Sequence, residues 1–226
     1  MSRLPLIHTV FACLLLLGWG CQPESPPQEE SKGKVQYLGP EQTGIHFVNQ
    51  LSEGPKRNII EYLYYYNGGG VAVGDINNDG LEDLFFTANE QPDKLYLNKG
   101  GLQFEDITEQ AGILPDDAWS TGAIFADFNN DGYLDLYVCK VGLGVMPPAH
   151  NLLYLNQQDG TFQESAEEAG LNIQGFSTQA CVLDYDKDGD LDLYLLNHNV
   201  HSVRSYGSTE KRQEQDPYAG DRFFEN

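Results

Sequence analysis

Short apolar runs flank three acidic turns in this chain. Runs rich in branched and aromatic residues lead into the turns at residues 71–73, 123–125 and 180–183. Similar runs leave the turns at residues 84–87, 136–139 and 193–196. Runs of this length and composition are typical of buried strands rather than of helices. The pattern therefore predicts three pairs of strands, each pair joined by an acidic turn.

Further strand signals follow each pair and extend the repeat. They lie at residues 94–98, 152–156 and 222–226, and the first two continue through a turn into residues 104–107 and 162–165. An Ala-Gly-Ile or Ala-Gly-Leu element closes the first two units. The acidic turns begin at residues 75, 127 and 184, so the repeat is 52 and then 57 residues long. Four short strands per unit at this period predict an all-β fold of β-propeller blades, each a four-stranded antiparallel sheet.

The acidic turns share a nine-residue pattern with oxygen-bearing side chains at positions 1, 3, 5 and 9 and glycine at position 6. These side chains are Asp75, Asn77, Asp79 and Asp83, then Asp127, Asn129, Asp131 and Asp135, then Asp184, Asp186, Asp188 and Asp192. The glycine permits the tight curl that brings them to one cation. At position 7 a backbone carbonyl usually serves as the ligand, here of Leu81, Tyr133 and Asp190.

Calcium suits these ligands best. Zinc prefers nitrogen and sulfur ligands, and the turns contain no histidine or cysteine. Magnesium prefers a small octahedral shell rich in water. We expect one calcium ion per loop, about three in all. The third loop should bind most tightly, because all four of its side-chain positions are aspartate. Acidic turns that bind nothing are the alternative.

An EF-hand is excluded by position 12, which is a bidentate glutamate in that motif. Here it is Phe86, Val138 and Leu195. A strand follows each turn where an EF-hand would continue as a helix.

The net charge of −21 argues against nucleic acids and anionic membrane surfaces as partners. Nucleic acids and anionic membrane surfaces attract proteins through lysine and arginine, and no basic stripe is present. Ten of the negative charges are carboxylates at positions 1, 3, 5 and 9 of the turns. Because crowded carboxylates repel each other, we expect calcium binding to stabilise the folded state.

The N-terminus predicts export. Residues 1–21 resemble a bacterial lipoprotein signal: one positive charge, a mostly apolar stretch, then Gly-Trp-Gly before Cys21. Cys21 would carry the acyl chains, so that the protein meets the membrane only through a lipid anchor. Leu17 stands four residues before Cys21 instead of three, which keeps ordinary secretion open. Residues 22–40 predict a disordered tether rich in Pro and Glu, and residues 41–226 the blades. The expected location is the outer membrane or cell surface, with a secreted or periplasmic protein as the alternative.

The three loops, the paired Leu-Tyr-Leu-Asn runs and the Ala-Gly elements carry a family resemblance. From about Gly44 onward the chain resembles the FG-GAP/VCBS repeats of integrin α-type propellers, and more specifically bacterial ASPIC/UnbV-domain relatives of cartilage acidic protein. The resemblance implies a seven-bladed ring, calcium in the hairpin between the first two strands of each blade, and ligand binding on a propeller face. Three blade starts cannot close such a ring, so we expect an N-terminal fragment of a longer protein. A trimer of three-blade chains is the alternative.

The predicted function is binding or adhesion to a protein or glycan ligand, without enzyme activity. An enzyme needs a convergent acid and base, whereas these acids alternate in calcium spacing. A scaffold for further domains and a part of a secreted polysaccharide-acting enzyme are the alternatives. Two extra stretches, 48–67 and 198–221, are candidate ligand surfaces.

Smaller features receive structural interpretations. Residues 68–70, all glycine, predict close backbone packing, and Tyr64–Tyr66 predict packing between blades, with a platform for sugar rings as the alternative. His198 and His201 are read as loop residues rather than metal ligands. Cys139 and Cys181 are expected to be buried thiols, with a disulfide between adjacent blades left open.

Overall fold

The computed structural model describes residues 35–115, 118–142, 146–198 and 218–226. The chain divides into two compact units, Met1–Tyr37 and Leu38–Asn226, and the second contains all the helices and strands described below. It begins with the single-turn helix α1 (Pro40–Thr43), which ends at Gly44 with a φ of 75°. The described residues include no helix long and apolar enough to cross a membrane.

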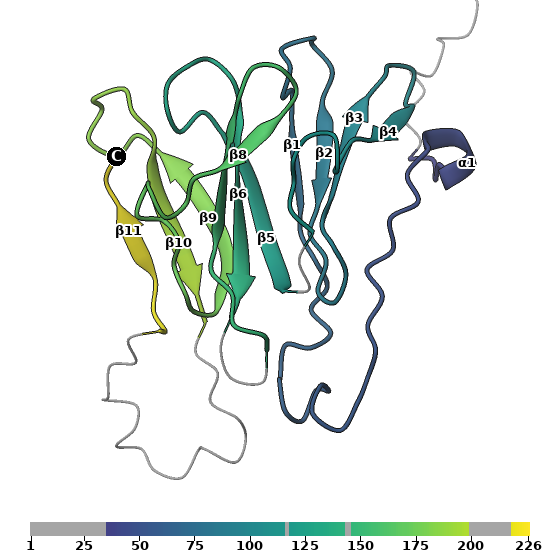
Figure 1. Cartoon of the computed structure of the whole chain (residues 1–226), viewed down its shortest axis with the longest axis vertical. Helices are drawn as coiled ribbons and strands as arrows, with labels where there is room; N and C mark the ends of the chain where they lie inside the picture. The colour runs from purple at the N-terminus through teal and green to yellow at the C-terminus, as the bar shows by residue number, and fades with distance from the viewer. Residues whose placement is uncertain (1–34, 116–117, 143–145, 199–217) are drawn as a thin grey trace, which may run out of the picture. The chain divides into compact units, whose positions relative to one another are not determined.

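Three antiparallel sheets follow along the chain (Figure 1). The first consists of β1 (Val71–Gly74), β2 (Asp83–Phe86), β3 (Lys94–Asn98) and β4 (Phe104–Asp106). The second consists of β5 (Trp119–Ala126), β6 (Asp135–Val141), β7 (Leu152–Asn156) and β8 (Phe162–Glu164). The third consists of β9 (Ser177–Leu183), β10 (Asp192–Asn197) and β11 (Arg222–Phe224). In each sheet the strands pair in chain order, which confirms the predicted all-β, blade-like architecture.

The register of the first strand pair is the same in all three sheets. Val73 lies opposite Leu84, Phe125 opposite Leu136, and Val182 opposite Leu193. Because register fixes which side chains share a face, equivalent residues point the same way in every sheet.

Apolar side chains fill the space between neighbouring sheets. One core joins the first sheet to the second through residues such as Ala72, Phe85 and Leu95. Another joins the second sheet to the third and includes Tyr137 and Leu153, which are equivalent to Phe85 and Leu95. The first and second sheets therefore each bury one face against the sheet that follows along the chain.

The thiol prediction is half right. Cys139 and Cys181 are both free thiols, so the disulfide is not formed between them. Cys139 is buried as expected, but Cys181 is exposed. Its equivalents Ala72 and Ile124 pack against the next sheet, whereas among the described residues no sheet covers the outer side of the third. Burial at this position depends on a neighbouring sheet, which the local pattern could not reveal.

Glycine allows the first strands of neighbouring sheets to approach closely. A Cβ on Gly70 would lie 2.6 Å from the carbonyl oxygen of Thr121, and one on Gly122 would lie 2.5 Å from that of Thr178. These distances are too short for any side chain, and a Cβ on Gly69 would lie 2.0 Å from the carbonyl oxygen of Thr87. The predicted close packing is therefore confirmed at Gly69 and Gly70, whereas a Cβ on Gly68 would meet nothing within 4 Å. The hydroxyl of Thr121 donates to the carbonyl of Ser177 at 2.7 Å and links the second sheet to the third.

A buried ion pair joins the first two sheets. Lys140 Nζ lies 3.6 Å from a carboxylate oxygen of Asp93, with side chains only 1% and 7% exposed. The ammonium also donates to the hydroxyl of Ser120 at 2.8 Å, and that hydroxyl donates to Asp93 at 2.8 Å. This network satisfies the charges that burial removes from water.

Candidate metal centres

The three acidic loops share a backbone conformation that explains their sequence. Position 4 is left-handed in each, with φ of 59° at Asn78, 57° at Asn130 and 68° at Lys187. Position 6 is left-handed as well and is always glycine, with φ between 85° and 102°. Two left-handed residues two positions apart curl the chain so that the ligand positions turn inward. The glycine requirement inferred from the sequence is confirmed.

In the first two loops the side chain at position 1 braces the curl. Asp75 accepts hydrogen bonds from the backbone N–H of Asp79 at 3.1 Å and of Gly80 at 2.7 Å. Asp127 accepts the equivalent bonds from Asp131 at 3.1 Å and Gly132 at 2.8 Å. The side chain at position 3 joins the same cluster, because the amide of Asn77 donates to Asp79 at 3.0 Å. The side chains at positions 1, 3 and 5 therefore lie close together in these two loops.

The third loop gathers carboxylates without an amide between them. Asp184 accepts from the backbone N–H of Lys187 at 2.6 Å instead of from positions 5 and 6. Asp184, Asp186 and Asp188 each offer an oxygen within 4.8 Å of the others, and all three side chains are exposed. Partial desolvation and the neighbouring Asp188 raise the pKa of Asp186 above its ordinary value. Three carboxylates this close repel each other unless a cation lies among them.

The aspartate at position 9 is buried and ties each loop to its sheet. Asp135 is fully buried and accepts from the backbone N–H of Phe128 at 2.9 Å and of Asn156 at 2.8 Å. Burial is the main reason that its pKa rises to about 6. Asp83 and Asp192 accept bonds at the equivalent positions. A carboxylate oxygen has two lone pairs, so these bonds leave capacity for a cation.

The asparagine that accompanies position 9 was missed by the sequence analysis. Its backbone N–H reaches the position 9 carboxylate from the end of β3, β7 or just beyond β11, at Asn98, Asn156 and Asn226. In the second sheet its side-chain amide also donates to the carbonyl of Ile76 in the first loop at 2.8 Å. Its recurrence at the end of the two Leu-Tyr-Leu-Asn runs and of the Arg-Phe-Phe-Glu-Asn run was the available signal.

Position 7 does not contribute its side chain to its own loop. The backbone N–H groups of Leu81, Tyr133 and Asp190 donate to the position 5 aspartates at 2.9, 2.9 and 3.0 Å. The carboxylate of Asp190 instead accepts a hydrogen bond from Asn130 of the neighbouring loop. Asn78 likewise donates to the carbonyl of Gly132 at 3.0 Å, so adjacent loops are bonded to each other.

The donor set fits calcium. Every side chain at positions 1, 3, 5 and 9 offers oxygen, and the third loop brings three carboxylates together. Hard cations with flexible coordination prefer this combination. Cys21 and the predicted tether up to residue 34 lie outside the described residues, as does His201.

Comparisons with known proteins identify the family of these repeats. The model of the FG-GAP-like repeat matches residues 75–138 and 143–195, together more than half of the chain. Cartilage acidic protein 1 of Xenopus tropicalis is 28% identical over 160 residues, covering 68% of this chain and 24% of that protein. The Homo sapiens protein of the same name is 29% identical over 139 residues, covering 59% of this chain and 21% of that protein. The match thus spans about a quarter or less of these relatives.

Proposed function

The chain belongs to the FG-GAP-like repeat family, and on this premise we propose that it is a calcium-binding extracellular module for adhesion or ligand binding. The single observation that carries calcium is the carboxylate cluster of Asp184, Asp186 and Asp188, whose oxygens lie within 4.8 Å of one another. A divalent cation among them would offset the mutual repulsion of the three carboxylates.

Each loop would hold its ion with the side chains at positions 1, 3, 5 and 9 and the backbone carbonyl at position 7, and the position 9 carboxylate would also fix the loop to the sheet. The first two loops hold Asn at position 3, so each offers one fewer charge than the third. We expect affinities on the order of 10⁻⁴ to 10⁻³ M, as in other extracellular modules, with the third loop tightest. The ions would stabilise the fold by binding the native state alone.

The proposal also includes a lipid anchor on Cys21 that attaches the protein to the membrane. The relatives named above favour an extracellular location, and the leader of residues 1–21 favours a lipid-anchored protein of the bacterial envelope. The ligand would be a protein or a glycan. We propose binding rather than catalysis because the carboxylates of the loops are arranged for a cation.

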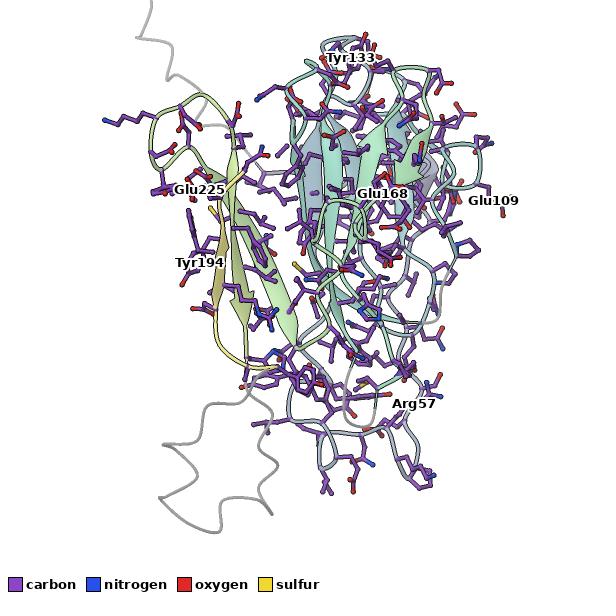
Figure 2. The ribbon with its side chains drawn as sticks, turned by 60° about the vertical axis from the view of Figure 1, so that its left-hand side comes forward. Arg57, Glu109, Tyr133, Glu168, Tyr194 and Glu225 are labelled. Atoms are coloured by element: carbon purple, nitrogen blue, oxygen red, sulfur yellow. The ribbon has the colours of Figure 1, made fainter. Side chains whose placement is uncertain are left out.

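Calorimetric titration of the calcium-free protein tests the proposal. We expect about three sites, and a melting temperature that rises with millimolar calcium. Asp188→Asn should remove the tightest site, whereas Glu168→Gln, on the segment after β8, should leave all sites unchanged (Figure 2). No heat of binding and an unchanged melting curve would contradict calcium binding. A screen of glycans and matrix proteins with and without calcium then tests adhesion.

A further inference from the structure

A cavity of about 190 Å³ lies at the opposite end of the strands from the acidic loops. It opens where β1, β5 and β9 begin, whereas the loops follow the far ends of these strands. In Figure 2, Tyr133 of the second loop labels one end of the unit and Arg57 the other. The cavity is therefore separate from the proposed calcium sites.

Aromatic side chains form one wall of the cavity. Tyr62 is 2% exposed and packs edge-on against Trp119 with ring centroids 5.7 Å apart. Tyr64 is only half-buried, and its ring lies 4.4 Å from the imidazole of His198. The sequence analysis assigned Tyr64–Tyr66 to packing between blades, with a platform for sugar rings as the alternative. Tyr65, fully buried, fulfils that role, whereas Tyr64 lines the cavity.

His198 brings an unsatisfied nitrogen to the same place. Its Nε2 is 3.2 Å from the hydroxyl of Tyr62. Its Nδ1 is buried and has no hydrogen-bond partner in the part of the chain that the structure describes. Burial lowers the pKa of His198 to about 4, so the imidazole is neutral at pH 7. A buried polar atom without a partner destabilises the folded state, and a hydrogen bond to a ligand hydroxyl would remove that penalty.

The remaining lining is polar but uncharged. Asn67, Thr178 and Gln179 contribute amide and hydroxyl groups, and the triple glycine contributes backbone. None of the described side chains that line the cavity is charged at neutral pH, although the chain carries a net charge of −21. An ionic ligand would find no counter-charge here. The volume is below the roughly 300 Å³ at which sites for drug-sized ligands begin, so the ligand should be a single small ring.

We propose that this cavity binds one neutral sugar ring, with Tyr64 against its apolar face and His198 Nδ1 bonded to a hydroxyl. Aromatic rings beside amide and hydroxyl groups suit a ligand that has C–H faces and a hydroxyl rim. The inference rests on the proposed function, since it selects glycan over protein as the ligand class and places the glycan opposite the calcium loops.

Tryptophan fluorescence gives a direct assay. The chain has two tryptophans, so Trp119 is the sole one in a Trp19→Phe protein. We would titrate this protein in calcium with methyl glycosides of glucose, galactose, mannose and N-acetylglucosamine. Glucuronate and choline test charged ligands, the latter because aromatic cages also bind quaternary ammonium groups. We expect at least one neutral glycoside to change the emission with saturation.

Two variants and one control locate the binding. Tyr64→Ala should weaken the glycoside about tenfold, the equivalent of one aromatic contact. His198→Phe keeps a ring and removes Nδ1, and should weaken it by a similar factor. Tyr66→Ala, on the same segment but 52% exposed and outside the lining, should bind as the parent does. Circular dichroism checks that each variant folds. If Tyr64→Ala does not fold, the result with His198→Phe alone tests the proposal.

The proposal is overturned if no neutral glycoside changes the emission, if choline or glucuronate binds in preference, or if both variants bind as the parent does. Calorimetry with calcium on the same protein separates this result from the calcium proposal. Intact calcium binding without sugar binding refutes the cavity alone, and sugar binding without calcium binding refutes the calcium sites alone.

Discussion

Lys140→Met tests whether the ion pair between the first two sheets sustains their contact. The substitution keeps an unbranched apolar side chain but removes the ammonium 3.6 Å from Asp93, leaving that carboxylate in a place where its side chain is 7% exposed. Removing one partner of a buried pair costs about 3–5 kcal/mol, because the other charge stays desolvated. The hydroxyl of Ser120 also loses a donor at 2.8 Å.

The structure supplies a matched control for this prediction. Lys94 and Asp106 form another Lys–Asp pair at 2.8 Å, but their side chains are 35% and 38% exposed. Exposed pairs contribute about 0–1 kcal/mol, so Lys94→Met should change stability by no more than that. Urea unfolding of both variants at constant calcium measures the difference. Equal losses in the two variants would refute the reasoning that burial sets the cost.

Three further predictions concern the strand contact at Gly122, the pH response of His198 and the hydrogen bonds of Asp135. Gly122→Ala should lower stability by about 2 kcal/mol or more, since its Cβ would lie 2.5 Å from a carbonyl oxygen, and thermal melting measures this. Stability should fall as pH drops from about 6.5 to about 4. The pKa of His198 is lower in the folded than in the unfolded chain, so in this range the unfolded chain binds more protons. Urea unfolding at pH 7 and pH 5 should show a loss about 1–2 kcal/mol smaller in His198→Phe. Asp135→Ala should cost about 2–4 kcal/mol even in chelator, since one buried and one half-buried backbone N–H group lose their acceptor. An unchanged melting curve in chelator would contradict this role of Asp135.

Local patterns were sufficient for the strands and the loops. Short runs of branched and aromatic residues predicted the strands, and the glycine at position 6 predicted a tight curl, where φ is 85° at Gly80. Such features depend on neighbours a few residues away, so one sequence reveals them. The same logic identified the aspartates at positions 1, 3 and 5 that cluster in the third loop.

Contacts between distant segments were out of reach. The bond from Asn156 to Ile76 joins residues 80 apart, and the cavity combines Tyr62 with His198, which are 136 apart. Nothing in either local sequence specifies its partner. The exposure of Cys181 has the same cause, since a strand residue becomes buried only if another sheet lies against it.

The exposed thiol of Cys181 can report whether the uncovered side of the third sheet is occupied. Tyr194, Leu196 and Phe223 are 37–44% exposed there, and Figure 2 shows Tyr194 on that side. An accessible thiol, Cys181, accompanies them, whereas Cys139 is sealed in the interior with a pKa raised by burial. The rate at which a maleimide dye labels Cys181 therefore measures occupancy of that surface. Slower labelling at higher protein concentration, or in a longer form of the protein, would show that something has docked there.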